Sequence, residues 1–177
     1  MATQPQREII EKLKQNHIRL VDMVTGLDEK DFAAAPPGKW TAGQQLDHIY
    51  LSLKPLTMAL GLPKLAPKIL FGTSNRPPRD YDAVVEKYHK ALEKGGVAPS
   101  NFVPKPIYYK DKDALAAKLK SNLSKLISNL GRYSEEDLDK LLLPHPLLGK
   151  MTIREMLYFT IYHSEHHYNA ALKNLER

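Results

Sequence analysis

The 177-residue chain contains no cysteine, and this absence removes several classes of function. Without cysteine there is no disulfide framework, no thiolate nucleophile and no cysteine-bound zinc or iron–sulfur site. A metal site in this chain must therefore use nitrogen or oxygen ligands. The sequence also lacks an apolar run long enough for a signal-peptide core or a membrane span. We therefore expect a cytoplasmic protein with no membrane partner.

The chain carries a net charge of +6, but the signals of a nucleic-acid-binding protein are missing. Its lysines are scattered among acidic residues, without a recognisable binding motif and without the interleaved aromatic residues that stack on bases. We interpret the charge as a solvated surface and expect no nucleic-acid partner.

Strand-like alternation is nearly missing too, whereas apolar residues recur at helical spacing almost throughout. This pattern predicts an all-α fold, and the length suits a single domain, residues 1–177. Residues 63–106 are rich in proline and glycine and read as an excursion from the core with one extra helix. We predict a four-helix bundle with this excursion between core helices 2 and 3. Helices are expected over residues 5–25, from 41 to a kink or end at Pro55, and over 81–94, 111–130 and 152–175.

Two of the expected helices have local start signals. Thr41 and Gln44 are spaced as a capping box, in which each side chain binds the backbone amide of the other residue. Thr152 and Glu155 repeat this spacing before the last helix. The preceding segment PHPLLGK, residues 144–150, is expected to be a loop that leads into that helix.

The last expected helix contains the segment HSEHHYN, residues 163–169, with three histidines in five positions. Residues three or four apart on a helix face the same way, so His163 can share one ligand with His167 or with His166. Two imidazoles form a weak metal site, and a third ligand must come from elsewhere in the chain.

His48 is well placed to be this third ligand. It lies about 10 Å past the start of the second helix, while His167 lies about 12 Å before the end of the last helix, at 1.5 Å per residue. If the two helices pack antiparallel, His48 and His167 lie at the same height along the bundle axis, in the core.

The other histidines have simpler interpretations. His17 lies on the inward stripe of the first helix, which favours a core histidine with a hydrogen-bond partner over a ligand. His89 is expected at the edge of the excursion helix. His145 precedes the last helix, so we expect it and His163 at opposite levels of the bundle.

The segments KWTAGQQLDHI (39–49), HPLLGKMTIRE (145–155) and HSEHH (163–167) together resemble the DinB/YfiT-like superfamily of metalloenzymes. The resemblance covers both ends of the core and implies a DinB-like four-helix bundle over the whole chain. It implies the metal ligands His48, His163 and His167, and thus chooses residue 167 over His166. Characterised members of this superfamily include thiol transferases and isomerases, and other members are regarded as metal-dependent hydrolases.

Three neutral imidazoles leave a divalent ion its full charge and an open coordination position, and zinc or nickel suits such ligands. We expect a metal-dependent hydrolase or thiol-linked transferase that acts on a small molecule. The alternative is a metal-stabilised binding protein without turnover, and a homodimer is possible in either case. The sequence argues against a zincin mechanism, because Ser164, not glutamate, follows His163. No general base is identified. Arg76 and Arg79 belong either to a solvated loop, which we favour, or to a site for an anionic substrate group.

Overall fold

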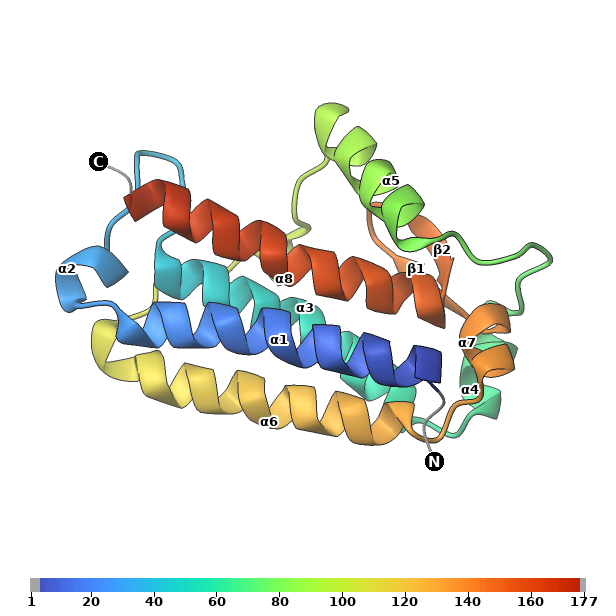
Figure 1. Cartoon of the computed structure of the whole chain (residues 1–177). Helices are drawn as coiled ribbons and strands as arrows, with labels where there is room; N and C mark the ends of the chain where they lie inside the picture. The colour runs from blue at the N-terminus through green and yellow to red at the C-terminus, as the bar shows by residue number, and fades with distance from the viewer. Residues whose placement is uncertain (1–3, 176–177) are drawn as a thin grey trace.

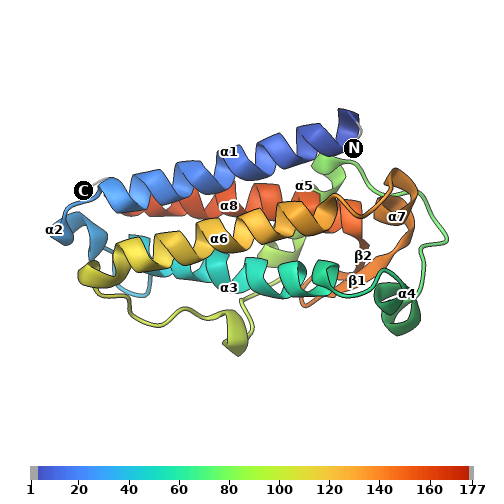
Figure 2. The same cartoon turned by 90° about the horizontal axis from the view of Figure 1, so that it is seen from below.

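Four long helices lie side by side in the computed structural model, which describes residues 4–175 (Figures 1 and 2). Helix α3 packs against α6 and α8, and α1 packs against the same two helices. The predicted all-α, DinB-like four-helix bundle is confirmed. The four core helices are α1 (Gln4–Gly26), α3 (Ala42–Gly61), α6 (Lys112–Leu130) and α8 (Ile153–Leu175).

The direction of these helices explains why the chain needs an excursion. Helices α1 and α8 run one way along the bundle, and α3 and α6 run the other way (Figures 1 and 2). Because α3 and α6 are parallel neighbours, the chain must return along the bundle before α6 can begin. The return segment contains α4 (Leu65–Phe71), α5 (Tyr81–Glu93) and the short 3₁₀ turns η1 (Ser100–Phe102) and η2 (Tyr109–Asp111). The extra helix predicted there is α5, which packs on α8.

The predicted helix starts form as expected. Thr41 accepts a hydrogen bond from the amide of Gln44, whose side chain accepts one from the amide of Thr41. Thr152 and Glu155 make the same reciprocal pair before α8. Two short helices, α2 (Glu29–Phe32) and α7 (Glu135–Lys140), lie in the connections at the bundle ends.

Pro55 does not end the second core helix, so of the two predicted outcomes, a kink or an end, the end is wrong. Helix α3 continues through Pro55 to Gly61. The proline is exposed, whereas Leu56 and Leu60 after it are buried in the core. The apolar stripe therefore continues past the proline, and its burial outweighs the backbone hydrogen bond that proline cannot donate.

Residues 144–150 are not the simple loop that the sequence predicts. They form most of a β-hairpin with strands β1 (Leu142–His145) and β2 (Gly149–Thr152), in which His145 pairs with Gly149. Gly149 has φ +71°, a left-handed conformation that glycine adopts without strain. The strands are too short to give a clear alternating pattern, which is why the sequence does not reveal them.

The buried apolar side chains form two clusters, and the core histidines lie near the junction between them. Along α1, His17 lies between Leu13 of one cluster and Leu20 of the other. Along α3, His48 lies between Leu46 and Leu53, which also belong to different clusters. Within residues 4–175, no helix combines the length and apolarity needed to span a membrane.

Candidate metal centre

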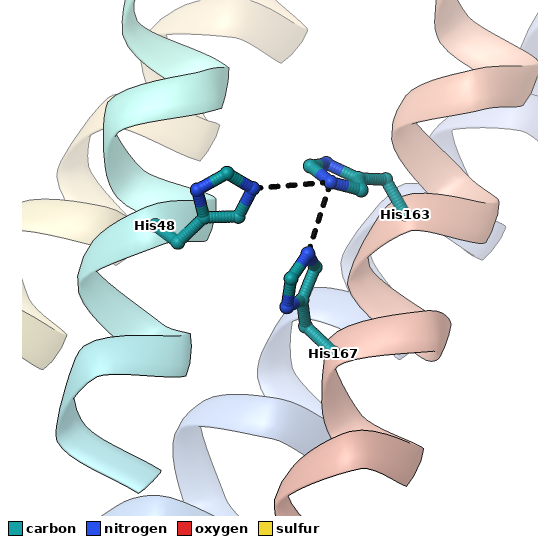
Figure 3. Close-up of side chains that lie close together, drawn as sticks. All are labelled: His48, His163 and His167. Carbon is teal, nitrogen blue, oxygen red and sulfur yellow. Dashed lines mark hydrogen bonds between the residues drawn. The ribbon is translucent and has the colours of Figure 1, made fainter. Parts of the chain in front are cut away.

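Helices α3 and α8 bring three histidine rings together, as the antiparallel packing predicts. Nε2 of His163 lies 3.2 Å from Nε2 of His48 and 3.0 Å from Nε2 of His167 (Figure 3). His163 and His167 are one turn apart on α8, and His48 reaches them from α3 (Figure 3). All three are buried, with exposed fractions of 4%, 6% and 7% for His48, His163 and His167.

Hydrogen bonds on the opposite ring nitrogens define the protonation of two of these rings. Nδ1 of His48 lies 2.7 Å from the carbonyl oxygen of Phe102, which can only accept, so Nδ1 donates. Nδ1 of His167 likewise donates to the side-chain oxygen of Gln45. The amide nitrogen of Gln45 donates to the carbonyl of Trp40 at 3.4 Å, which orients its oxygen toward His167.

The Nε2 atoms of His48 and His167 therefore present lone pairs toward His163. Burial, the largest cause, lowers the pKa of all three histidines, and neighbouring histidines lower the pKa values further. Neutral rings in these tautomers cannot all hydrogen-bond to one another, since at most one Nε2 proton is available from His163. A cation between the three nitrogens would satisfy every lone pair.

The two nitrogen separations that involve His163 fit such a cation. Imidazole nitrogens at about 2.0–2.1 Å from a tetrahedral zinc ion are about 3.3 Å apart. The observed Nε2 separations of 3.0 and 3.2 Å are close to this value. Among residues 4–175, His48, His163 and His167 form a group that could hold a metal ion, and no further histidine or carboxylate joins it. Their role as ligands stays a prediction.

Aromatic side chains limit the rotation of these rings. Phe159 stacks on His163 with centroids 4.7 Å apart and planes at 26°. Trp40 stacks on His167 at 6.0 Å and 18°, and it also contacts His48 at 4.8 Å. The three nitrogens are therefore held toward one point before any ligand arrives.

The three histidines line a cavity of about 450 Å³ that His17, His145 and His166 also line. The expectation that His145 lies at the opposite level from His163 is wrong. The β-hairpin folds back against α8, and the His145 ring lies 4.3 Å from Phe159, which stacks on His163. Its Nδ1 accepts hydrogen bonds from the amides of Leu147 and Leu148, both at 3.1 Å.

His17 and His89 are located as the sequence predicts, and His166 lies outside the three-histidine group. His17 is a core histidine, 1% exposed, whose Nδ1 donates to the carbonyl of Leu13 at 2.7 Å. His166 is half-buried and faces α5, with its ring 5.7 Å from that of Tyr88. His89 is exposed on α5 and hydrogen-bonds to the hydroxyl of Tyr162.

Arg76 and Arg79 belong neither to a solvated loop nor to a site for a substrate anion. Both bind Glu155, whose side chain is fully buried at the start of α8. Arg76 does so with two parallel hydrogen bonds of 2.6 and 3.0 Å. The sequence shows Glu155 only as a capping residue, because its arginine partners come from a distant segment. Both arginines are absent from the cavity wall.

Comparison with known families agrees with this arrangement. The family model of the DinB superfamily matches residues 11–171, from α1 to the last turns of α8. The chain belongs to the DinB superfamily. Searches of curated proteins and of solved structures gave no significant match. Membership of the DinB superfamily is compatible with a metal-binding site at the three histidines, and it does not define a specific reaction.

Sequence reasoning missed three parts of this DinB-superfamily site: Gln45, the carbonyl of Phe102, and His145. Gln45 had a usable signal, because it lies three residues before His48 and so shares its helix face. The Phe102 carbonyl had no sequence signal, because every residue has a backbone carbonyl. The position of this carbonyl depends on the fold of the excursion. The position of His145 depends on the unrecognised hairpin.

Proposed function

We propose that this DinB-superfamily chain is a divalent-metal-dependent enzyme that uses His48, His163 and His167 to act on a small molecule. The reaction is a hydrolysis or a thiol-linked transfer. The convergence of three uncharged imidazole nitrogens on the wall of a cavity carries the proposal. A buried cluster of this kind has lone pairs that the protein itself does not satisfy.

The absence of a fourth ligand in the described part of the chain supports a catalytic centre over a structural one. Structural zinc sites are closed by four protein ligands, whereas catalytic sites use three and keep a position for water or substrate. The group here has three members, and all of them face the cavity. When bound, the ion would supply a full double charge that lowers the pKa of a bound water or polarises a bound thiol or carbonyl.

The chain's own residues hold the site and shield it. Gln45 and the Phe102 carbonyl hold the protons of His167 and His48 on Nδ1, so that Nε2 is free to bind. Trp40 and Phe159 cover the ring faces and exclude water from them. Zinc and nickel both suit a site of neutral imidazoles, and availability in the cell selects between them.

Metal analysis tests this proposal with a control built into the same helix. The purified wild type should retain about one zinc or nickel ion per chain, and His48→Ala, His163→Ala or His167→Ala should lose most of it. His166→Ala removes the neighbouring histidine, which is outside the group, and should keep the wild-type content. Equal metal content in all five proteins would contradict the proposal.

Ligand exchange then distinguishes an enzyme from a metal-stabilised binding protein. Protein loaded with cobalt, a spectroscopic substitute for zinc, should change its visible absorption when azide or a small thiol is added, because the open position accepts it. The His166→Ala protein should respond in the same way. A spectrum that neither reagent alters would indicate a closed site and a non-catalytic protein.

A further inference from the structure

The cavity beside the three histidines is long, and its two ends differ. On α8 its wall extends from Met156 to His167, and on α3 from Ala59 back to His48. Each stretch covers about 16 Å at 1.5 Å per residue. Because α3 and α8 are antiparallel, the histidines of both helices meet at one end, and Met156 and Ala59 lie toward the other. The volume of about 450 Å³ is typical of a small-molecule site.

The wall of this cavity carries no lysine, arginine, aspartate or glutamate among the described residues. Charged groups nearby are engaged elsewhere. Glu155 binds Arg76, and the ammonium group of Lys87 donates to the carbonyl of Leu148 at 2.5 Å. Leucine, proline and aromatic side chains make up most of the wall away from the histidines, including Leu53, Leu92, Leu143 and Phe71.

The wall also carries uncharged polar side chains, and the protein itself engages two of those that lie away from the three histidines. The hydroxyl of Thr160 donates to the carbonyl of Met156 at 2.8 Å, and Nδ1 of His145 accepts two backbone amides. A charged or strongly polar group inside the cavity would therefore lose its hydration without finding a counter-charge, which is strongly unfavourable. The end with the three histidines is where the wall could hold a metal ion, and hence a metal-binding group of a ligand.

We infer that the cavity binds a substrate with an elongated, uncharged alkyl or aryl body and one metal-binding head. The head lies at His48, His163 and His167, and the body extends between α3 and α8 toward Ala59 and Met156. This inference rests on the proposed function for the head of the substrate, whereas the recognition of the body depends only on the apolar wall. Among residues 4–175, the wall offers no charged side chain that could pair with the charges of a polar thiol cofactor.

A series of n-alkyl hydroxamates, from butyl to octyl, tests the inference on the zinc-loaded protein. The hydroxamate group binds zinc, and only the tail length varies. Trp40, the single tryptophan of the chain, lies on the cavity wall and reports binding through its fluorescence. Affinity should rise about threefold per methylene, as expected for burial of apolar surface. An octyl chain that ends in a carboxylate should bind at least about tenfold more weakly than the plain octyl chain.

Variants at the far end locate the tail. Ala59→Phe should shorten the cavity, so that the octyl compound loses at least about tenfold in affinity while the butyl compound changes less than about twofold. Unchanged butyl binding also shows that this variant is folded. Met156→Ala should have the opposite effect and favour the longest tails. Ala114→Phe makes the matched change at an exposed position of α6 and should alter neither affinity.

Three results would overturn the inference: affinities that do not depend on tail length, equal binding of the carboxylate-ended chain, and a length dependence that Ala59→Phe leaves intact. Failure of the proposed metal site would give a different result, namely loss of zinc binding by the wild type. If the wild type retains no zinc, n-alkanols of the same lengths can be titrated into the metal-free protein. A threefold rise per methylene, abolished by Ala59→Phe, would still support the apolar cavity, and its absence would overturn it.

Discussion

Helix α8 carries two buried polar groups that are built in opposite ways, Glu155 at its start and the pair His163 and His167 two to three turns later. At the start, the carboxylate of Glu155 is charged, and its oxygens accept hydrogen bonds from Arg76, Arg79 and the amide of Thr152. At the histidines the rings are neutral, and Nε2 of His163 lies 3.2 and 3.0 Å from Nε2 of His48 and His167, with at most one proton among the three nitrogens.

The difference separates a structural polar group from one that lacks a ligand. Buried charge is tolerated where the protein supplies its partners, as it does at Glu155. Buried lone pairs without donors are unfavourable, and a protein keeps them where a ligand can satisfy them. We therefore expect substitutions at Glu155 to affect folding and leave metal binding intact, and substitutions around the histidines to do the reverse.

The largest effect on stability is expected at Glu155, at the start of α8. Glu155→Ala should lower the free energy of unfolding by about 3–5 kcal/mol, because it removes the partner of two arginines and a helix cap together. Urea unfolding measures the change, and the folded variant should retain wild-type metal content. Glu165→Ala, on the same helix, is the control and should change stability by about 0.5 kcal/mol or less. A loss below about 1 kcal/mol in Glu155→Ala would contradict the structural role.

Acid should weaken the histidine region before the Glu155 region. Burial lowers the pKa of His17 from 6.5 to about 4. The unfolded chain binds a proton below about pH 6.5, so the stability contributed by neutral His17 is complete above that pH and is lost as pH falls toward 4. In metal-free protein, His17→Leu should reduce the loss of unfolding free energy between pH 7 and 4 by about 2–3 kcal/mol. An unchanged pH profile would contradict this.

Glu155 should respond in a lower pH range. Burial alone would raise the pKa of its carboxyl, but hydrogen bonds from Arg76 and from the amides of Arg79 and Thr152 hold that pKa below the ordinary 4.5. The carboxylate therefore contributes its full stability above pH 4.5 and loses it as pH falls below that value.

A smaller effect, confined to metal binding, is expected at Gln45. Gln45→Ala removes the acceptor that orients His167 and should weaken zinc binding about 10–100-fold, measured by competition with a chelator. Gln45→Glu keeps an oxygen acceptor and should restore most of the affinity. Zinc affinities that are equal in both variants and the wild type would show that Gln45 does not position His167.

The smallest effect concerns Arg79, whose side chain is one-third exposed. Arg79→Ala should lower the free energy of unfolding by about 1 kcal/mol or less, because its backbone amide still donates to Glu155 at 2.7 Å. Arg76→Ala removes two parallel hydrogen bonds and should have a larger effect in the same urea titration. The reverse order would contradict the geometry at Glu155.

Features with local causes were predictable from the sequence. The caps at Thr41 and Thr152 depend on residues three positions apart, and both form. Helix lengths and one assumption of antiparallel packing predicted that His48 meets the histidines of the last helix, and the family resemblance chose His167 over His166 as the partner of His163. Pro55 shows the limit of local rules, since buried leucines beyond it keep the helix intact.

Features that join distant segments were not predictable in the same way. The hairpin that brings His145 to the cavity is too short to have a strand pattern. The partners of Glu155 come from the excursion, as does the Phe102 carbonyl that binds His48. No spacing rule connects these residues, because their distance depends on how the excursion packs against α8.

The sequence by itself determined the long helices, their caps and the histidines available for a site, because periodicity and helical rise depend only on neighbouring residues. The choice of His167 over His166 came from the resemblance to the DinB/YfiT-like superfamily. The tertiary structure alone decided which nitrogen of each ring faces the centre, what surrounds it and which charges are neutralised. These properties depend on contacts between segments far apart in the chain, and packing of the whole molecule sets those contacts.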